Sequence, residues 1–233
     1  LKSASFFVFG RTVKFTKPPL TTPEQLALLK SRGLAVPDED LAARELTHSG
    51  YYRLSGYWLP FEKDASAPLR EHQFLVGASF GTALDLCRFD RQLRLLVLEA
   101  IELVEVSIRT SWAREVSLEL GSHAYLDPGN FHRRDRYDRN WQKLQADIDG
   151  SHEIFIAHYR GKYSEPEWPP IWMIAEIMTL GTLSKWYTNL GSQKIRKRIA
   201  KVYGLQAPLL DSALHNLTLV RNICAHHARL WDR

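Results

Sequence analysis

The stretch that decides the fold is CRFDRQLRLLVLEAIELVEVSIR, residues 87–109. Its apolar side chains recur at three- and four-residue intervals, the spacing of one face of an α-helix: Leu93, Leu96, Val97, Ala100, Ile101, Val104 and Ile108. The opposite face carries Arg91, Arg94, Glu99, Glu102 and Arg109. This pattern predicts an amphipathic helix that buries one stripe. We expect it to run from about residue 79 to Leu120, because Gly121 is a natural stop.

Two pairs of opposite charges stand four residues apart in this helix. Asp90 precedes Arg94, and Glu105 precedes Arg109. Residues at this spacing are neighbours on a helix surface, where each such pair contributes roughly 0.2–0.5 kcal/mol. We therefore expect two ion pairs along the helix, and we interpret the charges of CRFDRQLR as a mainly structural cluster.

The segments before this helix indicate a smaller helical region. Thr22 is a candidate N-cap with Pro23 at the first helical position, and Gly33 is a candidate end of that helix. DEDLAARELTHSG (38–50) predicts a second helix, and the aromatic-rich YYRLSGYWLPF (51–61) predicts a hydrophobic wedge. We expect residues 1–20 to form an extended arm and residues 63–78 a loop. Residues 1–75 are thus predicted to be an N-terminal arm and helical extension.

Residues 76–233 are predicted to form a helical bundle. A loop is expected over 122–137, followed by a polar helix from about Asp138 and an extended EPEWPP segment. Four further helical segments follow: IWMIAEIMT, LGTLSKWYTNLG, SQKIRKRIAKVYG and a last helix over 207–231. Because no alternating pattern of strand length and no repeat is present, the predicted fold class is all-α.

Composition narrows the class of protein. Of 233 residues, 45% are apolar, which favours a folded core over disorder. The two cysteines, Cys87 and Cys224, lack the spacing of a disulfide scaffold, and the early apolar run FFVF is too short for a secretory signal. No stretch reaches the roughly 18 apolar residues of a membrane span. We expect a cytoplasmic protein that does not enter a membrane. The net charge of +5 is compatible with a polyanionic partner.

The chain ends on RNICAHHARLWDR, residues 221–233, where cations and imidazoles are dense. On a helix, Asn222, His226 and Arg229 share one face, whereas Leu217, Val220 and Cys224 face the core. Arg221 stands about 140° from His226 and His227 about 100° from it. The polar residues are therefore predicted to form a continuous strip along the helix, next to the strip of apolar residues that faces the core.

These residue types can cleave RNA without a metal. A histidine exchanges protons near neutral pH, and an arginine stabilises the charge of a phosphate in its transition state. An asparagine can orient the histidine or the ribose. The products expected are a 2′,3′-cyclic phosphate and a 5′-hydroxyl.

Two other interpretations of this segment stay open. Arg221 and His226 are also typical of a buried polar pair that braces a helix end. Cys224, His226 and His227, with His215, could bind zinc, although their spacing is unlike common zinc motifs. His227 is either a secondary site residue or a structural histidine.

Arg221, Asn222 and His226, on the last helix of an all-α bundle, resemble the ribonuclease motif of HEPN domains, and His227 also fits the permitted spacing. The rest of the chain is similar, over roughly residues 16–233, to the Abi-like family of bacterial abortive-infection proteins (the AbiD/AbiF type). The similar blocks are KPPLTTPEQLALLKSRGL, YYRLSGYWLPF, CRFDRQLRLLVLEAIELVEVSIR, PPIWMIAEIMTLGTLSKWY and RNICAHHARLWDR.

This resemblance implies a HEPN-type bundle that acts on RNA in phage defence or as a toxin. It implies Arg221, Asn222, His226 and His227 as catalytic residues, no cofactor, and a homodimer in which two motifs meet. It is also compatible with an RNA or protein antitoxin as partner. The alternative is a non-catalytic protein of the same fold that holds a regulatory noncoding RNA.

Basic residues elsewhere are candidates for contact with RNA phosphates. The helix KIRKRIAK carries Lys194, Arg196, Lys197, Arg198 and Lys201, and RRDRYDRNWQK (133–143) is a second basic segment. Arg53 and Arg229 can also reach a phosphate. Each cluster is equally typical of a solvated helix face, so both interpretations stand.

Overall fold

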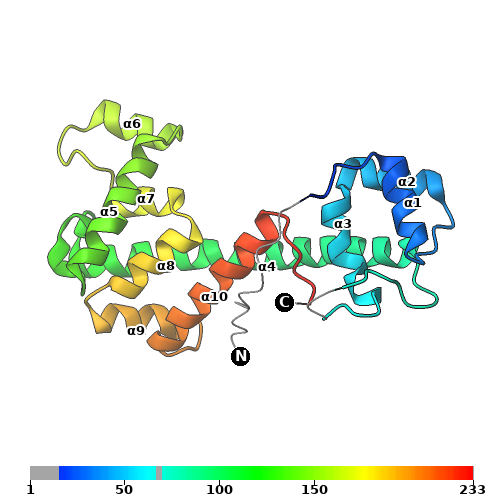
Figure 1. The fold of residues 1–233 in the computed structure, drawn as a ribbon. Coiled ribbons are helices and arrows are strands. Elements are labelled where there is room, and N and C mark those ends of the chain that lie inside the picture. The colour runs from blue at the N-terminus through cyan, green and yellow to red at the C-terminus, as the bar shows by residue number, and fades with distance from the viewer. Residues whose placement is uncertain (1–15, 67–69, 233) are drawn as a thin grey trace. The chain divides into compact units, whose positions relative to one another are not determined.

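The computed structural model describes residues 16–66 and 70–232, and within these it contains ten α-helices, three short 3₁₀ helices and no β-strand beyond isolated bridges (Figure 1). The predicted all-α fold class is confirmed. Residues 1–15 of the predicted arm and 67–69 of the predicted loop lie outside the described residues.

The chain divides into two compact units, unit 1 (Leu1–Arg88) and unit 2 (Phe89–Arg233). Their boundary falls inside α4 (Phe80–Leu120), the long helix predicted from residues 87–109. The division predicted from the sequence precedes this helix, at residue 75, and stays a prediction. Each unit has a hydrophobic core of its own.

Unit 1 contains α1 (Thr22–Ser31), α2 (Glu39–Ser49), α3 (Tyr51–Trp58), the 3₁₀ helix η1 (Leu59–Phe61) and the start of α4. The aromatic-rich segment 51–61 forms α3 and η1, and its Leu54 and Trp58 are buried in the core of the unit. Isolated backbone pairings, such as that of Glu62 with Phe74, order the described part of the following loop.

The first helix is capped one residue earlier than predicted. Thr21, not Thr22, is the N-cap, and the Glu24 carboxylate accepts the Thr21 backbone N–H at 2.7 Å in a capping box. At the other end Gly33 adopts φ +90°, as predicted, which only glycine adopts without strain. The two threonines cannot be ranked as caps by composition alone, and the acid three residues after Thr21 decides between them.

The long helix α4 matches its prediction in extent, and Gly121 follows it with φ +98°. Both predicted ion pairs, Asp90–Arg94 and Glu105–Arg109, are present. Ile101 and Ile108 of the predicted stripe are buried in the core of unit 2.

Two details of the α4 prediction were wrong. Leu96 is 64% exposed and Ala100 is exposed as well, because the predicted stripe is wider than the face that this helix buries. Arg94, placed on the polar face, is only 5% exposed. It lies inside because its guanidinium pairs with the fully buried Asp90 carboxylate.

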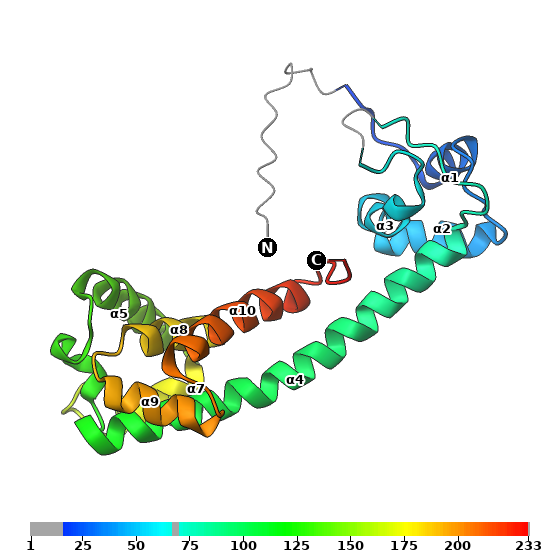
Figure 2. The same cartoon turned by 90° about the horizontal axis from the view of Figure 1, so that it is seen from below.

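The rest of unit 2 consists of α5 (Arg134–Asp149), α6 (Ile154–Lys162), α7 (Ile171–Ile177), α8 (Leu180–Asn189), α9 (Gln193–Val202) and α10 (Ala207–Ala225). Two 3₁₀ helices, η2 (Ala124–Leu126) and η3 (Pro128–Asn130), precede α5. Helix α8 packs against both α5 and α10, and Figure 2 shows it beside them. Helix α5 begins before the expected Asp138, since Arg134–Asp138 and Asp135–Arg139 ion pairs support its first turns.

Trp186 of α8 lies at the centre of the core of unit 2. It is fully buried, and the rings of Trp112, Tyr125, Phe131 and Tyr137 surround it. The Phe131 ring is nearest, at 5.0 Å between centroids and nearly perpendicular to the indole. Such edge-to-face contacts stabilise an aromatic cluster beyond its buried area.

We predict that Trp186→Ala lowers the free energy of unfolding of unit 2 by about 3–5 kcal/mol, because it opens a cavity in this cluster. The matched control is Trp172→Ala, since Trp172 is 51% exposed and the same truncation there should cost about 1 kcal/mol or less. Urea denaturation of both variants measures the difference. Equal losses would contradict the central role of Trp186.

Candidate functional site

The candidate site lies at the C-terminal end of α10. Leu210, Leu214 and Cys224 of this helix are buried, and Leu217 and Val220 pack against the same core. The predicted core-facing line of the helix is therefore confirmed. Asn222 is exposed and Arg221 is half-buried beside this line.

The last helix ends earlier than predicted. It was expected to reach residue 231, but α10 ends at Ala225, with His226 as its C-cap. His227 follows with φ +57°, its N–H donates to the Cys224 carbonyl at 3.1 Å, and the Ala228 N–H donates to the Ile223 carbonyl at 2.9 Å. These two bonds form a Schellman motif, which satisfies carbonyls that the helix end leaves open. Arg229 therefore does not extend a helical face, and this part of the prediction was wrong.

The helix end changes the expected relation of the two histidines. The 100° separation of His226 and His227 holds only on a continuous helix, and the left-handed backbone of His227 interrupts it. Glycine normally occupies this position, because a Cβ there costs roughly 1–2 kcal/mol. Backbone strain of this kind concentrates at functional sites. Among the described residues, His72 and Asp232 also have a positive φ, so this conformation is not confined to the candidate site.

Asp90 of α4 fixes the segment that follows α10. Its Oδ1 accepts the Leu230 N–H at 3.0 Å and the Trp231 N–H at 2.6 Å, while its Oδ2 accepts a hydrogen bond from Arg94. The carboxylate is completely buried, so these donors replace its water. The Arg229 guanidinium lies 6.0 Å from the centre of the Trp231 ring. Asp90 is thus a positioning residue for the end of the chain, which the sequence did not identify.

The sequence predicts only one of the two roles of Asp90. An aspartate four residues before an arginine indicates an ion pair, and that much was predicted. Its second role depends on residues 140 positions away. Only the three-dimensional fold brings these together.

Four side chains form the candidate site: Arg221, Asn222, His226 and His227. Both histidines and Asn222 are exposed. The His226 backbone N–H donates to the Asn222 carbonyl at 3.0 Å. Among residues 16–66 and 70–232, no side-chain hydrogen bond or ion pair to any of the four is present, so the expected orientation of His226 by the Asn222 amide stays a prediction. Their polar atoms are available to a ligand or to a second chain.

The chemistry of Cys224 weighs against the zinc interpretation. The side chain is 1% exposed, and burial raises the pKa of its thiol, an effect that the Arg94 charge opposes and the Asp90 charge reinforces. Zinc binds the thiolate, which a raised pKa disfavours. Within the described part of the chain, no group of three or more histidine, cysteine or acidic side chains is arranged to hold a metal ion.

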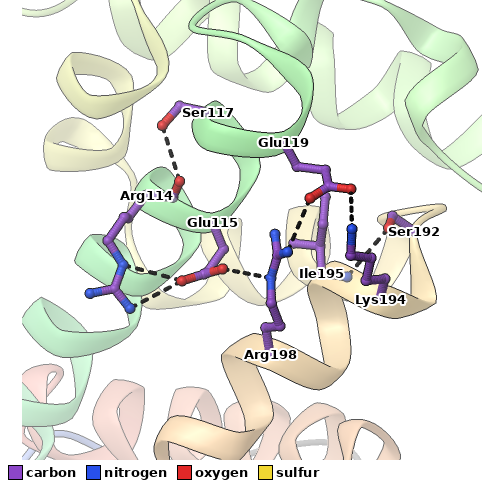
Figure 3. Close-up of polar contacts among 8 residues, drawn as sticks. All are labelled: Arg114, Glu115, Ser117, Glu119, Ser192, Lys194, Ile195 and Arg198. Atoms are coloured by element: carbon purple, nitrogen blue, oxygen red, sulfur yellow. Dashed lines mark hydrogen bonds and ion pairs between the residues drawn. The ribbon is translucent and has the colours of Figure 1, made fainter.

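Three of the cations on the basic helix α9 are engaged inside the protein. Arg198 pairs with Glu115 at 2.7 Å and with Glu119 at 3.0 Å, and Lys194 pairs with Glu119 at 2.8 Å, so α9 is bound to the end of α4 (Figure 3). Arg196 is buried, pairs with Asp211, and lies over the Tyr187 ring. These charges are partly neutralised, which reduces their attraction for a polyanion.

The remaining predicted phosphate contacts are more accessible. Lys197 and Lys201 of α9 are exposed and form no ion pair with another described residue. Arg53 is exposed on α3, in unit 1. The structure thus separates the basic cluster of α9 into three cations that pair with acids and two that form no ion pair with a described residue.

Unit 2 is an all-α domain in which an arginine, an asparagine and two histidines stand at the end of α10. The family model described as Abi-like protein matches residues 44–232, which is most of the chain, so the protein belongs to the Abi-like family. This family suggests a role in abortive infection, that is, in phage defence. No curated protein and no solved structure gives a significant match. In the described residues, no helix is long and apolar enough to cross a membrane.

We predict that Asp90→Asn lowers the free energy of unfolding by about 3 kcal/mol, because the buried Arg94 would lose the charge of the Asp90 carboxylate. The matched control is Asp85→Asn, which removes a carboxylate that is 75% exposed and pairs with Arg88 at the surface. The control should cost less than about 1 kcal/mol. Hydrogen exchange should also accelerate at the amides of Leu230 and Trp231. Unchanged protection of these amides would argue against the anchor.

We predict that His227→Gly raises the free energy of unfolding by about 0.5–1 kcal/mol, because glycine adopts the left-handed backbone without strain. His226→Gly is the control, since His226 has φ −88° and glycine there should lower stability by about the same amount. Thermal denaturation of both variants compares the two. If both glycine variants were equally destabilised, His227 would not be strained.

Proposed function

We propose that this protein is a cytoplasmic, metal-independent endoribonuclease of the HEPN type that acts as a homodimer in bacterial phage defence. The observation that carries the proposal is the set of Arg221, Asn222, His226 and His227 at the exposed end of α10, beside the Asp90 anchor. Family membership supports the biological role. The chemistry follows from the residue types.

In the proposed reaction a neutral imidazole accepts the proton of the ribose 2′-hydroxyl, and the 2′-oxygen attacks the adjacent phosphorus. The bond from phosphorus to the 5′-oxygen breaks, and a protonated imidazole gives its proton to the leaving oxygen. The products are a 2′,3′-cyclic phosphate and a 5′-hydroxyl end. His226 is the proposed proton-transfer residue. Arg221 stabilises the negative charge on the phosphorane-like transition state, and Asn222 orients His226 or the ribose.

The two proton transfers need two imidazoles, and two arrangements can supply them. His227 can act together with His226, because the left-handed backbone between them removes their fixed helical separation. Alternatively, His226 of a second copy completes the site. The strain at His227 supports a functional role for it in either arrangement.

An exposed apolar line supports a homodimer. Phe89, Leu96 and Leu103 of α4 recur every seven residues and are 50%, 64% and 73% exposed. Aligned exposed apolar residues on a helix are typical of a contact with another helix. A second copy of the chain would cover them and bring two motifs together.

The rival function is a non-catalytic protein that holds a regulatory noncoding RNA. The exposed Lys197 and Lys201, together with Arg53 and Arg229, are the candidate phosphate contacts for such a role. Either function is compatible with an RNA or protein antitoxin as partner. The two functions differ in whether bound RNA is cut.

We predict that the wild-type protein in EDTA converts labelled RNA to fragments with cyclic-phosphate ends. Arg221→Ala and His226→Ala should each lower the rate by at least about 100-fold, because each removes a group that acts in the transition state. Gel separation of the fragments, with phosphatase treatment of their ends, measures both rate and chemistry.

The matched controls are Arg44→Ala and His158→Ala, which truncate exposed side chains of the same types elsewhere and should leave the rate unchanged. The His227→Gly variant is expected to fold at least as well as the wild type, so any loss of cleavage in it reports the imidazole itself. Salt-sensitive retention of RNA without cleavage by any variant would establish the binding protein instead. Cleavage that survives Arg221→Ala and His226→Ala would overturn their catalytic roles.

A further inference from the structure

Unit 2 contains a pocket that lies apart from the four site residues. It has a volume of about 670 Å³ and is formed by side chains of α5, α8 and α10. A pocket of this size is in the range that holds small-molecule ligands. Unlike most such pockets, its lining combines cations, hydroxyls and an amide. This composition indicates a polar, negatively charged ligand.

The charge of the pocket is mainly positive. Arg136, Arg139, Lys143 and Lys185 line it, against a single carboxylate, that of Asp211. Asp211 is already paired with Arg196, while Asp135 pairs with Arg139 and Asp147 with Lys143. Arg136 and Lys185 are exposed and form no ion pair within residues 16–66 and 70–232. These two cations are therefore the ones that remain to bind an anion.

Three buried polar side chains also line the pocket, and one of them, Thr182, shares a hydrogen bond with Thr179. Asn140 is 9% exposed and Ser184 is 8% exposed, and neither side chain hydrogen-bonds to another described residue. Their polar atoms are not among the side-chain atoms that are buried without a partner, so they face the solvent of the pocket and are open to a ligand. A phosphate oxygen accepts from a hydroxyl, an amide N–H and a guanidinium alike. A phosphoryl group in the pocket would satisfy both side chains.

The pocket shares one side of α10 with the candidate site. His215 lines the pocket, and Leu219, Asn222 and His226 follow it at intervals of four, three and four residues. On a helix this spacing keeps the side chains aligned, and Asn222 lies about 10 Å beyond His215 along the axis. All four are exposed. A single strand of RNA that lies along this side of α10 could reach both places.

We propose that this pocket binds a phosphorylated nucleotide unit, and that the unit belongs to the RNA whose scissile bond lies at Arg221 and His226. Arg136 and Lys185 hold the phosphate, and Ser184 and Asn140 complete its hydrogen bonds. The choice of RNA rests on the proposed function, whereas the phosphate chemistry of the pocket does not. By holding one nucleotide of the RNA, the pocket would fix the position of the strand and so determine which of its phosphodiester bonds lies at the histidines.

The test uses a labelled single strand of 2′-O-methyl RNA about ten nucleotides long, which lacks the attacking hydroxyl and is not cleaved. We expect the double variant Arg136→Gln/Lys185→Gln to weaken binding about tenfold in fluorescence anisotropy. The slope of the logarithm of the binding constant against the logarithm of the salt concentration should become shallower by about 0.7 for each phosphate that is no longer neutralised.

The double control Lys197→Gln/Lys201→Gln removes two exposed charges outside the pocket and should weaken binding less. Ser184→Ala should weaken binding with no change in Tm, because the Ser184 hydroxyl has no hydrogen-bond partner among the described residues.

Adenosine 5′-monophosphate distinguishes the source of the phosphate. If the pocket variant loses the mononucleotide but keeps the oligonucleotide, the pocket binds a free nucleotide, and the assignment to RNA is overturned. If it loses the oligonucleotide, RNA is the ligand. If the pocket variant equals the control with both probes, the whole proposal is overturned. Because no probe is cleaved, a failure of the ribonuclease proposal would leave this result unaffected.

Discussion

The end of the chain depends on one buried carboxylate. Asp90 accepts the backbone N–H groups of Leu230 and Trp231, and Arg94 supplies the counter-charge that a carboxylate in the core requires. These contacts join the first residues of unit 2 to its last described ones. The short segment between α10 and Trp231 is therefore held at both ends, by the helix and by the anchor. The candidate histidines stand inside this segment, exposed but fixed in place.

Much of the fold could be predicted because its signals are local. The spacing of apolar residues over 87–109 and Gly121 predicted α4, and charges four residues apart predicted its ion pairs. The errors lie where two local signals compete or where the partner is distant. Thr21 and Thr22 are adjacent candidate caps for α1. The last helix was predicted to continue past Ala225, because nothing in the local sequence marks His227 as a residue with a left-handed backbone conformation. The second role of Asp90 depends on a contact across the whole of unit 2.

The candidate site was harder to predict than the fold, because more of its contacts join residues that are distant in the sequence. The residue types at 221–227 indicated proton transfer and phosphate binding. The structure places Asn222, His226 and His227 exposed at a helix end, with Arg221 half-buried beside them. Which cations of α9 are free to bind RNA could not be predicted, because the sequence does not show which acids on other helices pair with them. Arg196 and Arg198 are bound by acids on other helices. Of the pocket of α5, α8 and α10, the sequence indicated only the basic segment 133–143, which supplies Arg136, Arg139 and Lys143, because the rest of the lining comes from two distant helices.

If the His227 imidazole is used as proposed, folding stability and chemistry favour different residues at this position. A population of variants screened only for expression or heat resistance should collect glycine or asparagine there, since both accept a left-handed conformation more readily. A population screened for survival under phage attack should keep the histidine if the imidazole is used. The residue found at position 227 after each kind of screen would thus separate what the fold requires from what the function requires, without a biochemical assay.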